Sequence, residues 1–304
     1  MNISIHKASL AEQEQADKNS YSTWGKDESV EEYLARCKSS VRRGKAQCWV
    51  LTVDGVVASA LGCLPLQFYV DGDIVDGFGI ASVYTREDMR KRGFAEKLCQ
   101  HVIADQRSNN VYIGLLFSDV NPGYYEKMGF TLLSQTSHDC RALTEFIHSG
   151  PRASLQPFEP TSEIEWLQSN YHSFHGQMEF ALARDEEYWK YSIQANSDYL
   201  FWGIMHNNKR VGYVRVATAD ELWAICECVI NTTENREELL CGAHRQIAFL
   251  AQQAQATWIT SWQRPPKILQ EHYTQRKRSK AWPMIMAECQ QDILHTPIYV
   301  SDYF

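Results

Sequence analysis

The chain has 304 residues, of which 44% are hydrophobic and 22% are charged, and its formal net charge is −7. This length favours two domains, and the composition is typical of a globular protein with a buried core. The negative charge argues against a general nucleic-acid binder, and no apolar run is long enough to span a bilayer. The first residues lack the apolar core of a signal peptide, so we expect a cytoplasmic protein without nucleic-acid or membrane partners. The composition leaves its oligomeric state open.

The nine cysteines follow no spacing typical of a disulfide framework. Several of them, such as Cys48 and Cys63, lie in apolar runs, which predicts buried and reduced thiols. Cys226 and Cys228 flank Glu227, but a zinc site needs more ligands at suitable spacing. We therefore expect no metal site.

The first third of the chain predicts a short strand, a helix and a meander of three strands. Val30, Tyr33 and Cys37 recur at helical spacing, and Ser29 is a candidate cap for this helix. Asp54-Gly55 is a two-residue hairpin signal between two apolar runs. The expected elements are a strand over residues 2–8, a helix over 29–43, and strands over 48–53, 56–70 and 74–85.

A basic turn over residues 90–93 then leads into a helix. Residues 94–107 place Phe94, Leu98 and Val102 on one face of that helix. Residues 111–117 are continuously apolar, as in a central strand. The remaining expected elements of this half are a short helix over 124–128, closed by Gly129, and a strand over 130–133.

Prolines and glycine at residues 149–151 and 157–160 indicate a linker region. The elements expected after it are helices over 163–171, 184–194 and 236–255, and strands over 199–205, 211–216, 222–230 and 258–262. The second half thus repeats the order of the first half, a meander and then a helix. We expect an α/β chain of two domains, residues 1–148 and 149–304, each with a mixed, mostly antiparallel sheet flanked by helices.

The turn at Gly93 suits a pyrophosphate. The first N–H groups of a helix have no internal partner, and the helix dipole attracts an anion there. Gly93 leaves the backbone accessible, and Arg90, Lys91 and Arg92 add positive charge. The alternative is an exposed basic turn that binds nothing.

The pattern Arg90-x-x-Gly93-x-Ala95 resembles the acyl-CoA-binding motif of the GNAT superfamily of N-acetyltransferases. The resemblance implies tandem GNAT folds with acetyl-CoA as co-substrate. It also implies that the preceding strand holds the pantetheine arm, although its longer distance from Gly93 leaves the contacting residues of that strand open. The cofactor-binding residues implied in this way are Ser82, Val83, Thr85, Arg90, Lys91, Arg92, Gly93, Phe94 and Ala95.

Residues 121–130 resemble a second GNAT segment, in which a tyrosine protonates the departing CoA thiolate. Tyr125 holds that position, and a phenol with a pKa near 10 can donate to a thiolate of similar basicity. The alternative is that Tyr125 is a packing aromatic beside the cofactor. Asn121 is expected to contact pantetheine, to cap the short helix, or to do both.

A narrower resemblance covers residues 20–135, where segments such as 79–85 and 116–120 are similar to fungal lysine N-acetyltransferases. It implies a free amino acid or another small amine as acceptor.

The two-domain layout is similar to bacterial acetyltransferases of the enhanced-intracellular-survival type. Residues 229–236 lack a basic glycine turn, so we expect the second GNAT unit to be degenerate and to complete the acceptor pocket. In that group the terminal carboxylate is the general base, which would make Phe304 catalytic. Asp119, Glu126 and a water chain are the alternative bases, and a frayed terminus is the alternative for Phe304.

The sequence therefore predicts an N-acetyltransferase that moves an acetyl group from acetyl-CoA to a primary amine of a small molecule. An amino acid such as lysine, a polyamine and an aminoglycoside-like amine are the candidate acceptors. Two other readings stay open: a peptide or protein amine as acceptor, and a non-catalytic acyl-CoA-binding protein of the same fold.

Overall fold

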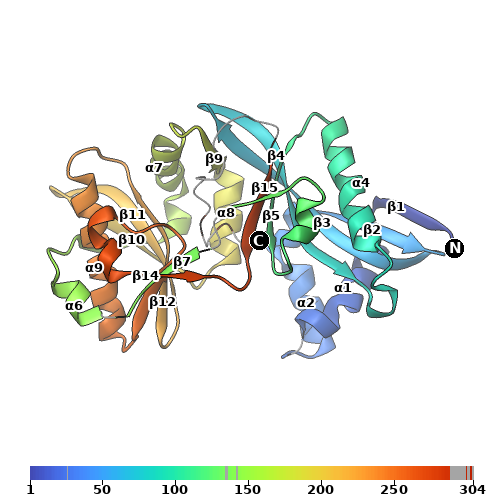
Figure 1. Cartoon of the computed structure of the whole chain (residues 1–304), viewed down its shortest axis with the longest axis horizontal. Coiled ribbons are helices and arrows are strands. Elements are labelled where there is room, and N and C mark those ends of the chain that lie inside the picture. The colour runs from blue at the N-terminus through green and yellow to red at the C-terminus, as the bar shows by residue number, and fades with distance from the viewer. Residues whose placement is uncertain (26, 134–135, 142, 288–298, 300–301, 303–304) are drawn as a thin grey trace.

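The computed structural model describes residues 1–25, 27–133, 136–141, 143–287, 299 and 302. Figure 1 shows two β-sheets beside each other, with helices between them and on their outer sides. Among the described residues, eight strands form the first sheet and seven form the second. Most neighbouring strands are antiparallel, so the prediction of two mixed, mostly antiparallel sheets with flanking helices is confirmed.

The first sheet has the order β1-β2-β3-β4-β5-β15-β6, and β9 pairs with the part of β3 that β2 does not reach. Its long meander follows the hairpin turns predicted at residues 54–55 and 71–73. The strands are β1 (Ile3–Lys7), β2 (Gln47–Val53), β3 (Val56–Val70), β4 (Asp73–Thr85), β5 (Ile113–Ser118), β6 (Thr131–Leu132), β9 (Phe180–Ala183) and β15 (Trp282–Met286).

Successive residues of β2 face opposite layers of helices. Trp49 and Leu51 share an apolar cluster with α4 (Phe94–Ser108), whereas Val50 packs with Ala16 of α1 (Leu10–Trp24). This is the two-residue alternation of a strand. Helix α4 therefore covers one face of the first sheet, and α1 covers part of the other.

The rest of that second face packs against α8 (Glu186–Ala195), which lies between the two sheets (Figure 1). Tyr188 and Tyr191 of α8 belong to the same cluster as Leu64 and Ala81 of the first sheet. Trp189 of α8 instead joins the cluster of the second sheet. One helix thus holds the two sheets together.

The second sheet has the order β14-β7-β13-β12-β11-β10-β8. Helices α6 (Leu143–His148) and α9 (Arg236–Gln253) pack on one face, and α7 (Ile164–His175) and α8 pack on the other. The strands are β7 (Thr136–Cys140), β8 (Ser154–Pro157), β10 (Leu200–His206), β11 (Lys209–Thr218), β12 (Leu222–Ile230), β13 (Trp258–Ser261) and β14 (Thr274–Lys277).

The sheets exchange strands across the boundary that we expected between residues 148 and 149. Strand β7 lies in the second sheet, whereas β9 and β15 lie in the first. Strand β15 inserts between β5 and β6, so the first sheet is completed by residues from near the end of the chain. The division into residues 1–148 and 149–304 therefore does not follow the sheets.

Three local expectations are corrected. The single helix expected over 29–43 is two helices, α2 (Val30–Ser39) and α3 (Val41–Lys45), because Ser40 between them has an extended backbone. Pro157 ends β8 and does not lie in a linker. Helix α1 was not predicted, although Ser9 and Glu12 form a capping box at its start. In the described part of the chain, no helix is both long and apolar enough to cross a bilayer.

Candidate active site

Strands β4 and β5 run parallel but pair over only part of their length. The paired residues run from Gly77 with Ile113 to Ile80 with Leu116. Beyond that last pair β4 continues to Thr85 and β5 to Ser118, and the described residues show no further pairing between them. Strand groups released from a ladder need other hydrogen-bond partners, and an extended ligand with amide groups can supply them.

A β-bulge lies in β4 directly after this point. Pairing with β3 shifts from Gly62–Ala81 to Ala60–Tyr84, so Ser82 and Val83 together oppose Leu61. Ser82 has a φ of 51°, a left-handed conformation that disfavours a non-glycine residue by about 1–2 kcal/mol. Such bulges turn a strand and re-aim its groups, and they are common next to active sites. Ser82 is exposed and Val83 half-buried, so the predicted pantetheine strand is accessible.

The predicted pyrophosphate turn connects β4 to α4 through a short 3₁₀ helix, Glu87–Met89. Gly93 is the N-cap of α4, with a φ of 75° and no side chain that caps the helix. A Cβ placed on Gly93 would meet no atom within 4 Å. The start of α4 thus opens onto free space, as the backbone cradle of an anion requires.

The basic residues of this turn have different local roles. Arg90 donates from Nε to the carbonyl oxygen of Thr85 at 3.1 Å, and its guanidinium lies 5.6 Å from the centre of the Tyr84 ring. Arg92 donates to the carbonyl oxygen of Asp88 at 3.3 Å, and Lys91 is exposed. Arg90 therefore braces the turn against the end of β4, whereas Lys91 and Arg92 place positive charge at the surface. Their roles in cofactor binding stay predictions.

Tyr125 lies in α5 (Gly123–Glu126), in the apolar cluster that also contains Ile80, Leu116 and Phe94. The end of the β4–β5 pairing, the start of α4 and Tyr125 therefore meet in one part of the molecule. Burial raises the pKa of Tyr125 well above its ordinary value, so the phenol keeps its proton at neutral pH. No hydrogen bond from its hydroxyl to another described residue is seen. A phenol that keeps its proton can donate it to a strongly basic group, but the raised pKa makes Tyr125 a weaker acid than a free tyrosine.

The neighbouring Tyr124 packs edge-to-face on Tyr125 with ring centres 4.9 Å apart. Burial raises the pKa of Tyr124 to about 12. The Oδ1 of Asn121 accepts a hydrogen bond from the Gly123 N–H at 3.0 Å, but Pro122 is the N-cap of α5, so Asn121 lies one residue before the capping position predicted for it. Its contact with pantetheine stays a prediction.

The candidate bases lie in different surroundings. Asp119 is exposed and accepts a hydrogen bond from the Ala281 N–H at 2.9 Å, which ties it to the segment before β15. Glu126 is exposed on α5. Phe304 lies outside the described residues, so its role as general base stays a prediction.

The second sheet repeats the strand–helix–strand topology of the candidate site but lacks the basic residues of the turn at Gly93. Helix α9 follows β12 and leads to the parallel strand β13, as α4 follows β4 and leads to β5. Its N-cap is Asn235, also in a left-handed conformation, but its first turn carries two carboxylates, Glu237 and Glu238, where that of α4 carries one, Glu96. Carboxylates at a helix start repel a phosphate. These residues fit the prediction of a degenerate second unit.

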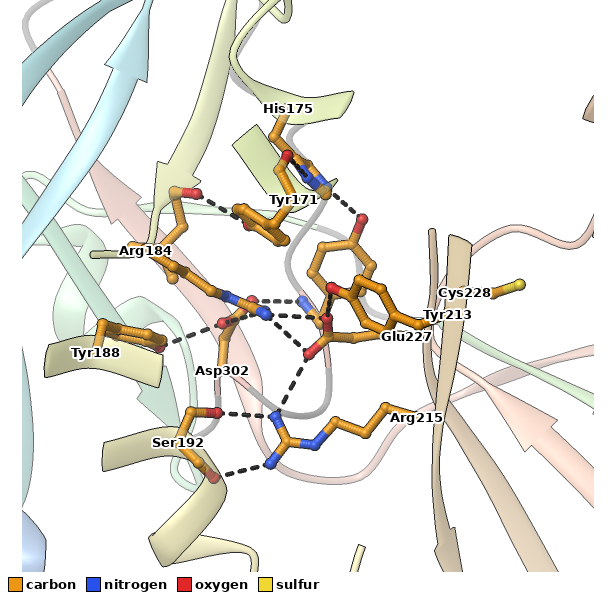
Figure 2. A network of polar contacts seen from close by, with 12 residues as sticks. Tyr171, His175, Arg184, Tyr188, Ser192, Tyr213, Arg215, Glu227, Cys228 and Asp302 are labelled. Carbon is orange, nitrogen blue, oxygen red and sulfur yellow. Dashed lines mark hydrogen bonds and ion pairs between the residues drawn. The ribbon is translucent and has the colours of Figure 1, made fainter. Parts of the chain in front are cut away.

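The sequence analysis missed a buried ionic network between the sheets, which Figure 2 shows. Arg184, Arg215, Glu227 and Asp302 are its charged members, and all are almost fully buried. The available signal was a single charge inside an apolar run, as at Glu227 in Ile225-Cys226-Glu227-Cys228-Val229.

A comparison with protein families decides the identity of the first sheet's domain. Residues 4–133 match the family model described as an acetyltransferase (GNAT) domain. This segment is a GNAT acetyltransferase domain. It includes the β4 bulge, the Gly93 turn and Tyr125. The predicted membership of the GNAT superfamily is thus confirmed, and the domain is that of an N-acetyltransferase.

The two-sheet chain as a whole is similar to solved GNAT structures. A probable N-acyltransferase from Enterococcus faecalis is 14% identical with a TM-score of 0.74, over 95% of this chain and 73% of that chain. A GCN5-related N-acetyltransferase from Anabaena variabilis is 18% identical with a TM-score of 0.71, over 93% and 72%. Eis1 from Mycobacterium abscessus is 11% identical with a TM-score of 0.63, over 93% and 73%. At these identities the likeness shows the fold alone. No curated protein matches the sequence.

Proposed function

We propose that this GNAT protein transfers the acetyl group of acetyl-CoA to a primary amine of a small molecule. The observation that carries the proposal is the convergence of three features: the unpaired stretch of β4 after Ile80, the open helix start at Gly93, and the buried phenol of Tyr125. The unpaired stretch of β4 suits the amides of an acyl-CoA, the open helix start suits its diphosphate, and the phenol suits its sulfur.

The residues fit a cofactor with a diphosphate. A Cβ at Gly93 would project into the space that an anion needs, and glycine leaves it free. Lys91, Arg92 and the N–H groups at the start of α4 would hold the phosphate oxygens. Ser82, Val83 and Thr85 would pair with the amides of the pantetheine arm through their backbone groups. Acetyl-CoA supplies the activated thioester.

The acceptor would approach from the face of the sheet opposite α4. On that face Tyr188 and Tyr191 of α8 belong to the same apolar cluster as Ala81, the residue before the bulge. The second half of the chain therefore covers the proposed acceptor side, which favours a small amine over the surface of a folded protein. N–H groups of the bulge would stabilise the negative charge that develops on the carbonyl oxygen. Tyr125 would then donate its proton to the leaving sulfur.

The test is a panel of amines assayed by thiol release from acetyl-CoA. The panel contains amino acids including lysine, polyamines, aminoglycosides and peptides with a free amine. Turnover of a small amine with higher kcat/KM than any peptide supports the proposal, and the reverse order contradicts it. Coenzyme A binding measured by calorimetry runs in parallel. Binding without turnover of any amine would instead indicate a non-catalytic acyl-CoA-binding protein.

A further inference from the structure

Four charged side chains lie almost fully buried between the two sheets. Arg184, Arg215 and Glu227 are at most 1% exposed, and Asp302 is 1% exposed. Within the described residues the group has two guanidinium groups and two carboxylates, so its charges balance. Buried charges are tolerated only when they are paired, because the loss of hydration is otherwise uncompensated.

The network joins parts of the chain that are far apart in sequence. Arg184 directly follows β9, which pairs with β3 of the first sheet, whereas Glu227 lies on β12 of the second sheet. Arg184 Nη1 contacts both carboxylate oxygens of Glu227 at 2.9 Å, and Nη2 contacts Asp302 Oδ1 at 2.7 Å (Figure 2). One guanidinium therefore links the first sheet, the second sheet and Asp302.

The Asp302 carboxylate is bound through both oxygens. The Tyr188 hydroxyl donates to Oδ1 at 3.2 Å, and the Tyr299 N–H donates to Oδ2 at 3.0 Å. Burial raises the pKa of the Asp302 carboxyl, and Arg184 acts in the opposite direction. Burial alone would lower the pKa of Arg184, but Asp302 and Glu227 raise it, so the guanidinium stays charged.

Groups other than Asp302 also contact the arginine. Its guanidinium carbon lies 4.3 Å from the ring centre of Tyr171 and 4.9 Å from that of Trp189. Glu227 is itself held by the Tyr213 hydroxyl at 2.7 Å. Arg184 and Tyr188 thus form a prepared site for a carboxylate, with an arginine whose orientation is already set.

Helix α8 connects this site to the GNAT domain. Tyr188 contacts Asp302 with its hydroxyl, and its ring belongs to the apolar cluster of the first sheet that also includes Ala81. Further along α8, Ser192 accepts from Arg215 through its hydroxyl and its carbonyl oxygen, both at 2.8 Å. The network therefore fixes α8 at two points.

We propose that Arg184 and Tyr188 form a carboxylate receptor for Asp302, and that the bound Asp302 positions α8 as a wall of the acceptor site. Arg184, Glu227 and Asp302 are then positioning residues. The effect on the acceptor rests on the proposed function, whereas carboxylate binding does not. Among the described residues, loss of the Asp302 carboxylate leaves two guanidinium groups with one carboxylate, so we expect the receptor to take up a small carboxylate from solution.

The first test is rescue of stability by acetate, which matches the methylene and carboxylate that Asp302→Gly removes. We expect a lower Tm for this variant in sodium chloride and recovery of at least part of the loss in sodium acetate at equal ionic strength. The wild type and the double variant Arg184→Met/Asp302→Gly should show no such acetate effect. If acetate changes the Tm of the single and the double variant equally, or changes neither, the proposal that Arg184 and Tyr188 bind a carboxylate is wrong.

Asp302→Asn covers the case in which the glycine variant fails to fold. Asparagine keeps the shape of the side chain and its hydrogen-bond acceptor for Tyr188, but it removes the charge that compensates Arg184. Its Tm should fall clearly below that of the wild type. An unchanged Tm would show that the carboxylate charge is not what Arg184 binds, and would overturn the proposal.

The second test measures positioning with the amine that the panel identifies. Asp302→Gly should raise KM for the amine by about tenfold, since a displaced wall misplaces the acceptor. The Kd for coenzyme A should stay within about twofold, because that site lies on the α4 face. Acetate should restore KM. Rescue of Tm by acetate without any change in KM would support carboxylate binding by Arg184 and Tyr188 but contradict the positioning role. Absence of turnover in the wild type would count against the proposed function alone.

Discussion

Ile80 and Leu116 form the last backbone pair between β4 and β5, and both pack in one apolar cluster with Tyr125. The point at which the ladder ends is therefore also the point at which a buried, protonated phenol is present. Ser82 and its bulge follow within two residues of Ile80. The end of the β4–β5 pairing, the bulge of β4 and Tyr125 of α5 therefore lie in one part of the molecule.

Gly93 offers the sharpest test of the cofactor site. Gly93→Ala should weaken coenzyme A binding at least about tenfold in calorimetry, because its Cβ occupies the space open to the anion. The left-handed φ of 75° adds a stability loss of about 1 kcal/mol. Gly55 is a matched control, since it has a φ of 82° and open space around its Cβ in the turn between β2 and β3. Gly55→Ala should cost similar stability and leave binding unchanged.

The surface charge of the turn should be measurable separately from its backbone. Lys91→Glu/Arg92→Glu should weaken coenzyme A binding by about 100-fold, since each charge-assisted contact contributes about 1.5–3 kcal/mol. The wild-type Kd should also rise with salt, and that dependence should be shallower in the double variant. Lys209→Glu, at the exposed first residue of β11, is the control for a general change in net charge. If both variants bind equally well, the turn is not the anion site.

Tyr125→Phe should lower kcat by about 100-fold or more while the Kd for coenzyme A stays the same, as expected for loss of a general acid. Because burial raises the pKa of Tyr125, its ionisation should not limit the rate anywhere near neutral pH. Tyr124→Phe is the matched control, since it removes an equivalent hydroxyl from the adjacent, partly buried ring. If the Tyr125→Phe variant has the kcat of the wild type, Tyr125 is a packing residue and not the general acid.

The basic glycine turn at the start of a helix could be predicted because its residues are contiguous. A phosphate turn needs glycine, nearby cations and a helix start, and residues 90–95 contain all three in sequence. The bulge at Ser82 could not be predicted, because its left-handed backbone is imposed by the pairing of β3 with β4. Helix α1 was missed for a different reason: only Ala16 and Ser20 are buried in it, so it shows little apolar periodicity.

The acceptor side depends on contacts between distant segments. Strand β15 pairs with β5, although it lies far beyond residues 4–133 in the sequence. No local pattern in residues 282–286 predicts β5 as its partner. In the same way, the pairing of Arg184 with Glu227 and Asp302 exists only after both sheets have formed. Isolated charges in apolar runs indicate a buried ion pair, but only the fold identifies the partners.

The pH dependence of stability should be set in part by buried histidines. Burial lowers the pKa of His244 to about 4, and its Nδ1 lies 2.8 Å from the Tyr273 hydroxyl. Between about pH 6.5 and 4 the unfolded chain therefore binds a proton that the folded protein does not, and stability falls as the pH falls. The loss from His244 alone should reach about 2–3 kcal/mol at pH 4.5, and burial of His175, whose pKa is lowered to about 3, acts in the same direction.

His244→Asn isolates this contribution, because it removes the titrating group and keeps a polar atom near Tyr273. Urea unfolding at pH 7 and at pH 4.5 gives the free energy of unfolding of both proteins under each condition. The variant should be the less stable protein at pH 7, since the fit around a buried ring is lost. Because it has one proton fewer to take up on unfolding, the difference between the two proteins should shrink by about 2–3 kcal/mol at pH 4.5. A difference that stays constant with pH would mean that His244 has the same pKa in the folded and the unfolded chain, and would contradict the prediction.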